Sequence, residues 1–336
     1  GVDQGEVLAL RAKDGKLLWR FALPGRSETS PIIVGSHVIV GSESGDVYAL
    51  DRKTGKPDWE VQTAGAVKGG LALDDGVLYG ANYAGQVFAL KASSGAYVWQ
   101  SSTQGLSFGR GGPVYSTLAV AFGRVYLGSI DTRVYSFDQD TGELLWSHST
   151  GDWVYAAPAV ADTPKTDPTV YVGSKDQNFY ALDAKTGEVR WQQDLGGVIL
   201  GAASVLGENV YVAGLGPNIG TFGFNVKTGK KTFESELGEY NPVISDGARM
   251  YLTGSSNIRA FVHESASEQR RSAHRRQAQR HRQSAAHRAK RKRQQAARKA
   301  KLERQQAAHR AKRQRQQRQR AAHRAAQQEK HQKNTG

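Results

Sequence analysis

The sequence predicts an all-β protein, a β-propeller of four-stranded antiparallel blades that is followed by a basic tail. The first observation is a recurring segment: residues 45–59 read GDVYALDRKTGKPDW, and residues 85–99 read GQVFALKASSGAYVW. A repeat of roughly 40–45 residues built from strand-like units is typical of propeller blades. The second observation is composition, because the chain has 38 glycines and many short runs of Val, Ile, Leu and Tyr. The copies end at intervals of 40, 40, 47, 45 and 42 residues, on Trp19, Trp59, Trp99, Trp146, Trp191 and Phe233.

One blade can be followed through residues 29–61. The β-branched run 30–34 predicts a first strand, and residues 37–41 and 46–51 predict the second and third. Gly55 supplies the positive φ of the next turn, and residues 56–61 complete a four-stranded meander.

Seven third-strand motifs indicate about seven blades. The first copy lacks its first two strands, and the last lacks a clear fourth strand. The alanine within the motif suits a close approach of neighbouring sheets, and its large neighbours fill the space between blades. The motifs lie at 7–10, 47–50, 87–90, 134–137, 179–182, 221–224 and 258–261.

The recurring tryptophan allows two interpretations. It could be a stacking platform for a ligand, or a structural clamp that packs on a Thr-Gly turn or on the next blade. Recurrence once per blade, with Phe233 in one copy, favours the clamp. We expect this structural role for Trp19, Trp59, Trp99, Trp146 and Trp191.

The pattern Gly-x-Val-Tyr-Ala-Leu-Asp-x-x-Thr-Gly-x-x-x-Trp resembles the PQQ-like (quinoprotein-type) propeller repeat, specifically its non-catalytic, BamB-like branch. The resemblance covers about residues 1–262. It implies a propeller that closes with eight blades in intact relatives. Other members of the family are quinoprotein alcohol dehydrogenases, for which the resemblance would imply a quinone, a calcium ion, a vicinal cysteine pair and a catalytic aspartate.

The residues point away from that enzymatic branch. The chain has no cysteine, which excludes the vicinal pair, thiol catalysis and cysteine-ligated zinc. The acids of the repeat turns, Asp51, Asp138 and Asp183, are expected to accept hydrogen bonds from local backbone N–H groups. No catalytic motif is recognisable. We expect no enzyme activity and no cofactor, with a PQQ- and calcium-binding oxidoreductase relic as the alternative.

The loops before the first strands form the candidate partner face. In propellers these loops surround the end of the central channel, and here they carry Glu28, Leu200 and an aromatic and basic set. The functional interpretation is a docking face for an extended peptide or an anionic group, and the alternative is an ordinary loop surface. The candidate residues are Lys68, Arg110, Trp153, Tyr155 and Tyr240.

The basic tail covers residues 263–336. Residues 268–336 hold 24 Lys/Arg and three acids, a net charge of +21, whereas residues 1–267 carry −6. An eleven-residue repeat reads AAHRAKRKRQQ, AARKAKLERQQ and AAHRAKRQRQQ over residues 285–317. Composition favours helix, but few acids relieve the cations, so we expect a partly helical or disordered segment.

Several partners suit this tail. An anionic membrane surface, a wall polymer or nucleic acid held through its phosphates would each bind it, and a solvated extension without a partner is the alternative. Its histidines lack the i,i+4 spacing of paired metal ligands, so no metal site is expected. The candidate anion-binding residues are Arg288, Lys290, Arg291, Arg293, Arg310, Lys312, Arg313 and Arg315.

Compartment and boundaries follow from the same residues. Gly1 to Gly5 match residues 41–45, so the chain begins inside a repeat, and we expect an upstream signal or anchor to be missing. The sequence-based hypothesis is a monomeric propeller scaffold for protein partners at the bacterial cell envelope, extracytoplasmic or membrane-anchored, with the tail as a tether. A cytoplasmic, nucleic-acid-associated propeller remains the alternative.

Overall fold

The computed structural model describes residues 5–105, 111–164, 166–216, 220–238, 240, 243–253 and 257–262. All of them belong to one compact unit, Gly1–Val262. The unit His263–Gly336, with the whole basic tail, lies outside the described residues. The described residues form antiparallel sheets only, which confirms the predicted all-β class.

Five sheets are complete four-stranded meanders. The first three are β3 (Ile32–Val34), β4 (His37–Gly41), β5 (Asp46–Asp51) and β6 (Pro57–Gln62); β7 (Ala72–Asp74), β8 (Val77–Ala81), β9 (Gln86–Lys91) and β10 (Tyr97–Ser102); and β11 (Ala119–Ala121), β12 (Arg124–Gly128), β13 (Arg133–Asp138) and β14 (Leu144–Ser149). The other two are β15 (Ala159–Thr163), β16 (Thr166–Gly173), β17 (Asn178–Asp183) and β18 (Val189–Asp194); and β19 (Ser204–Leu206), β20 (Asn209–Gly214), β21 (Gly220–Asn225) and β22 (Lys231–Ser235).

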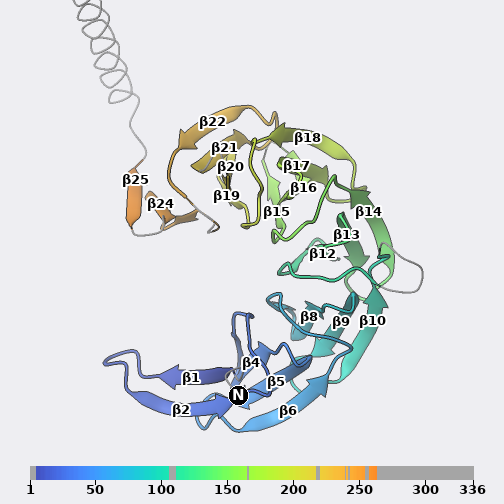
Figure 1. Cartoon of the computed structure of the whole chain (residues 1–336), viewed down its shortest axis with the longest axis vertical. Coiled ribbons are helices and arrows are strands. Elements are labelled where there is room, and N and C mark those ends of the chain that lie inside the picture. The colour runs from blue at the N-terminus through green and yellow to red at the C-terminus, as the bar shows by residue number, and fades with distance from the viewer. Residues whose placement is uncertain are drawn as a thin grey trace, which may run out of the picture. The chain divides into compact units, whose positions relative to one another are not determined.

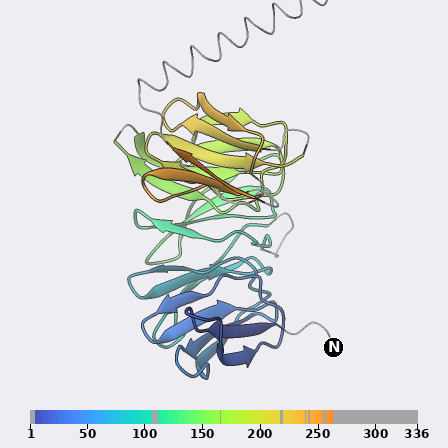
Figure 2. The same cartoon turned by 90° about the vertical axis from the view of Figure 1, so that its left-hand side faces the viewer.

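Two incomplete sheets flank these five. The first pairs β1 (Glu6–Leu10) with β2 (Leu17–Ala22), and the last contains β23 (Ile244–Ser245), β24 (Arg249–Thr253) and β25 (Ile258–Val262). Within this unit successive sheets follow one another around a common centre in chain order (Figure 1). Figure 2 shows the sheets from the side, in successive layers. This is the arrangement of propeller blades.

The core lies between neighbouring blades. In the complete sheets, third strands such as β5 and β13 are buried along nearly their whole length because a neighbouring sheet covers each of their faces. Each hydrophobic cluster combines residues of two successive sheets; Ile39 and Ala49, for example, share a cluster with Leu78, Phe88 and Leu90. Stability therefore depends on contacts between neighbouring repeats.

The tryptophans join each blade to the next. The Trp99 indole donates from Nε1 to the carbonyl of Gln139, at 2.8 Å, in the turn that follows the next blade's third strand. The ring also lies against Gly142, where an added Cβ would be 2.5 Å from Trp99 Cε3. Equivalent hydrogen bonds of 2.9, 3.1, 3.1 and 3.0 Å run from Trp19 to Arg52, from Trp59 to Ala92, from Trp146 to Ala184, and from Trp191 to Val226.

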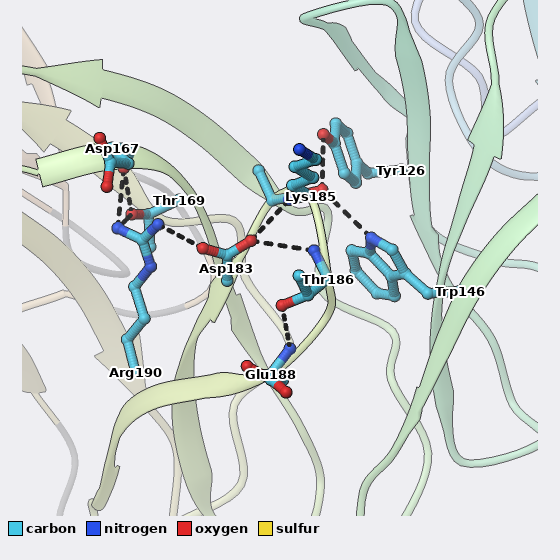
Figure 3. Close-up of polar contacts among 10 residues, drawn as sticks. Tyr126, Trp146, Asp167, Thr169, Asp183, Lys185, Thr186, Glu188 and Arg190 are labelled. Carbon is cyan, nitrogen blue, oxygen red and sulfur yellow. Dashed lines mark hydrogen bonds and ion pairs between the residues drawn. The ribbon is translucent and has the colours of Figure 1, made fainter.

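The acids of the repeat turns hold the acceptor loops in shape. Asp51 Oδ1 accepts from the amides of Lys53 and Thr54, at 3.1 and 2.8 Å, and from Thr54 Oγ1. The hydrogen bonds from Thr54 keep the pKa of Asp51 below its usual value. Asp183 Oδ1 accepts the two equivalent hydrogen bonds from the amides of Lys185 and Thr186, in the turn that receives Trp146 (Figure 3). The prediction that these acids bind local backbone is confirmed.

Candidate partner-binding face

The antiparallel meander brings two sets of loops to one end of the propeller. Each first strand begins at this end, and each second strand ends there. A backbone hydrogen bond joins the two loops of a blade: the amide of Tyr83 donates to Ala66 at 2.9 Å, and the amide of Lys175 donates to Trp153 at 2.9 Å. The first strands of neighbouring blades, β7 with β11 and β11 with β15, contact one another. We call this end the entrance face.

A buried residue fixes each loop before a first strand. Val67 and Val154 are fully buried and occupy the same place in two repeats that are separated by one. Each lies against a glycine of the preceding blade: a Cβ on Gly41 would be 2.6 Å from Val67, and one on Gly128 would be 2.4 Å from Val154. The residue that follows each valine, Lys68 or Tyr155, is partly exposed on the entrance face.

Lys68 lies among two carboxylates and two aromatic rings. Its Nζ is 2.6 Å from Glu43 Oε1 and 3.5 Å from Glu28 Oε1. The same nitrogen is 5.3 Å from the ring centroid of Tyr83 and 5.9 Å from that of Tyr115, within the range of a cation–π interaction. The hydrogen bond to Glu43 is the main reason why the pKa of Lys68 is raised, so this ammonium is charged.

Glu28 and Tyr115 connect non-adjacent blades across this face. The Tyr115 hydroxyl donates to Glu28 Oε2 at 2.5 Å. This hydrogen bond lowers the pKa of Glu28, with Lys68 adding to the effect. The same bond raises the pKa of Tyr115 to about 12. Glu28 is therefore a carboxylate at neutral pH, and it is exposed to solvent.

Aromatic side chains extend from this cluster over three blades. Tyr115 packs edge-on against Tyr83, with ring centroids 6.1 Å apart, and against Tyr155 at 5.2 Å. Tyr155 packs against Trp153 at 5.8 Å. Lys175 Nζ lies 4.3 Å from the Trp153 ring, which is 38% exposed. We call Tyr83, Tyr115, Trp153 and Tyr155 the aromatic strip.

The structure brings together three of the five candidate face residues, Lys68, Trp153 and Tyr155. Tyr240 is 57% exposed and lies before the last sheet, where its carbonyl approaches Gly201. Among the described residues, no ring contact is found between Tyr240 and the strip. Arg110 and the candidate tail residues lie outside the described residues.

Sequence reasoning missed Tyr83, Tyr115, Glu43 and Lys175. Tyr115 follows the buried Val114 and so holds the place that Lys68 and Tyr155 hold in their own repeats. The 47-residue interval between Trp99 and Trp146 obscured this equivalence, and alignment on the buried valines would have found it. The others come from the loops between second and third strands, which the sequence did not mark.

A buried carboxylate lies beneath the third complete blade's loop. Asp131 is 1% exposed, and its Oδ2 accepts from the Tyr135 hydroxyl at 2.5 Å and from the Gly105 amide at 3.0 Å. Its Oδ1 has no hydrogen-bond partner in the structure. In the part of the chain that the structure describes, no group of three or more His, Cys, Asp or Glu that could hold a metal ion is found.

The fold and this face define a β-propeller with an aromatic and charged loop surface at one end. The family model described as outer membrane protein assembly factor BamB matches residues 1–68, 44–165 and 158–297. The chain therefore belongs to the PQQ-like propeller family of BamB. In a sequence comparison with curated proteins, no match was found.

Solved structures of similar fold come from several functional classes. BamB from Moraxella catarrhalis is 22% identical, with a TM-score of 0.60 and 77% of each chain covered. A quinohemoprotein alcohol dehydrogenase from Pseudomonas putida is 16% identical, with a TM-score of 0.60, covering 76% of this chain and 62% of the other. Sqt1 from Saccharomyces cerevisiae is 14% identical, with a TM-score of 0.63, covering 78% and 79%. At these identities the likeness establishes the fold alone.

The residues that a quinoprotein dehydrogenase would use can be compared with those present in this chain. The chain has no cysteine for a vicinal disulfide, and three of the described acids are engaged elsewhere, Asp183 in a repeat turn and Glu28 and Glu43 with Lys68. Within the described ranges, no helix is long and apolar enough to cross a membrane.

Proposed function

We propose that this protein is a non-enzymatic scaffold that binds a protein partner on the entrance face. The observation that carries the proposal is the aromatic strip, to which three successive blades contribute with Lys68, Glu28 and Lys175 at its borders. Tyr and Trp supply large contact areas at low entropic cost and dominate protein interfaces. The match to a family named for an assembly factor supports a role in protein–protein contact.

The chemistry of the strip suits an extended segment of the partner. Its rings meet edge to face, which leaves ring faces and hydroxyl groups available to both apolar side chains and backbone amides. Glu28 and Lys175 place opposite charges near its two ends, so the strip would favour one direction of the bound segment.

The proposal includes an extracytoplasmic location and a tether. The family's name supports the envelope, and the charge of +21 on residues 268–336 supports attachment to an anionic surface. A membrane surface, a wall polymer and nucleic acid share the anionic chemistry that would attract this tail. Binding of the full chain to anionic vesicles and to DNA distinguishes the membrane surface from nucleic acid.

Photo-crosslinking tests the face. A photoreactive amino acid is placed at Tyr155 and, as a matched control, at Lys91, an exposed residue at the opposite end of the third strand β9. In cells that express the full chain, we expect one discrete crosslinked partner from position 155 and none from position 91. Equal crosslinking from both positions, or none from either, would contradict the proposed face.

The oxidoreductase alternative has its own measurement. Purified full-length protein is analysed for bound calcium by mass spectrometry and for quinone by its absorbance after extraction. Stoichiometric amounts of either would replace the scaffold proposal with a cofactor-dependent activity.

A further inference from the structure

The hairpin between β11 and β12 contains an unusual residue. Phe122 and Gly123 form its two-residue turn, and both have positive φ, 55° and 70°. Turns with two positive φ values favour Asn, Asp or Gly at the first position. A bulky residue at positive φ is a strained outlier. Phe122 is also 51% exposed, so burial does not compensate the strain.

The other blades show what this position ordinarily carries. In the two-residue turns of three other repeats, the same position is Gly35, Asp75 or Gly207, with φ of 57°, 42° and 61°. The repeat architecture thus accepts small or turn-forming residues here. Phe122 retains a strained conformation and an exposed ring at the same place, which suggests a role outside folding.

The Phe122 ring borders a groove between two blades, at the end opposite the entrance face. The groove has a volume of about 510 Å³. Its lining includes Pro168 and the buried residues Tyr126 and Ala184, and the Tyr126 hydroxyl donates to the Ala184 carbonyl at 3.1 Å (Figure 3). Pro168 therefore borders the groove above a buried and hydrogen-bonded layer.

Charged side chains border the groove. Asp183 is neutralised by Arg190, whose Nη2 donates to Asp183 Oδ2 at 2.6 Å (Figure 3). Arg190 is itself fixed by contacts of Nη1 with the Asp167 carbonyl and Thr169 Oγ1, each at 3.0 Å. The remaining charges at the border are those of Arg124 and the exposed Lys185, which are positive, and the Asp167 carboxylate, so the net charge of the border is positive.

We propose that this groove, with Phe122 as its anchor, is a second docking surface that binds an acidic segment of a partner protein. An apolar side chain of the segment packs between Phe122 and Pro168, and its carboxylates face Arg124 and Lys185. Charge complementarity selects this partner chemistry over a basic segment. The strained turn holds the Phe122 ring exposed, where it can contact the partner.

Fluorescence polarisation with the full chain tests the proposal. The probe is a labelled short peptide of alternating aspartate and leucine, compared with the same peptide that carries lysine in place of aspartate. Phe122→Asn converts the turn to Asn-Gly, which both φ values favour. We expect its melting temperature to rise by about 2–4 °C while its affinity for the acidic peptide falls by about tenfold.

Asp75→Phe is the matched control, because it moves the ring to the same place in the preceding blade. It should lower the melting temperature and leave acidic-peptide affinity at the wild-type value. Equal binding of the two peptides, unchanged affinity in Phe122→Asn, or a lower melting temperature in Phe122→Asn would each overturn the proposal.

Discussion

Removal of the Trp99 indole should weaken the joint between two blades. The ring is 8% exposed, contacts Gly142 and lies 6.0 Å from the Tyr79 ring. Trp99→Ala should cost about 3–5 kcal/mol of unfolding free energy, as for other buried Trp truncations. Trp99→Phe keeps most of the packing and loses the hydrogen bond to the Gln139 carbonyl, so about 1–2 kcal/mol is expected.

Urea unfolding followed by circular dichroism measures these changes. Trp153→Ala is the control; this indole is 38% exposed, so its loss should cost less than about 1 kcal/mol. Gly142→Ala should also destabilise the wild type, since φ is 73° and the new Cβ would strike Trp99. In the Trp99→Ala background part of that cost should disappear. A loss below about 1 kcal/mol for Trp99→Ala, or full additivity with Gly142→Ala, would refute the clamp.

Three further predictions concern titration and the tail. Tyr115→Phe removes the main cause of the lowered pKa of Glu28, so an NMR titration should show that this pKa rises toward 4.5. A carboxyl group whose pKa is lowered in the folded state stabilises the fold at pH values above its unfolded-state pKa. The variant should therefore lose less stability than the wild type when the pH is lowered. Burial lowers the pKa of His148, so stability should fall as the pH drops below about 6.5, and His148→Phe should flatten this dependence in urea titrations; an unchanged slope would contradict it. Truncation after Val262 should abolish binding to anionic vesicles or DNA that the full chain shows at low salt; equal binding by both would rule out the tether.

Much of the fold could be predicted because the same strand, turn and tryptophan signals recur in each repeat. The motif at 47–50 marks a strand buried on both faces, and Gly55 with Asp51 marks the turn that follows it. Trp59 then indicates the contact with the next blade. These signals are local, so they are readable without knowing where any blade lies.

The candidate face was less predictable because its members come from different blades. Lys68 and Tyr155 could be found from the sequence because each lies just before a first strand. Their connection depends on Tyr115, which belongs to the blade between theirs and contacts both side chains. The hydrogen bond between Glu28 and Tyr115 joins residues 87 positions apart. A local sequence pattern cannot predict a contact between residues so far apart in the chain.

By itself, the sequence determined the blade: its strand order, its turns, its buried tryptophan and the separate basic composition of the tail. Periodicity and turn chemistry act within some forty residues, so they are written into each repeat. Only the tertiary structure decided which loops meet on the entrance face and that Phe122 holds a positive φ beside a groove. Those features depend on how neighbouring sheets pack, and packing between repeats combines residues that are distant in the chain.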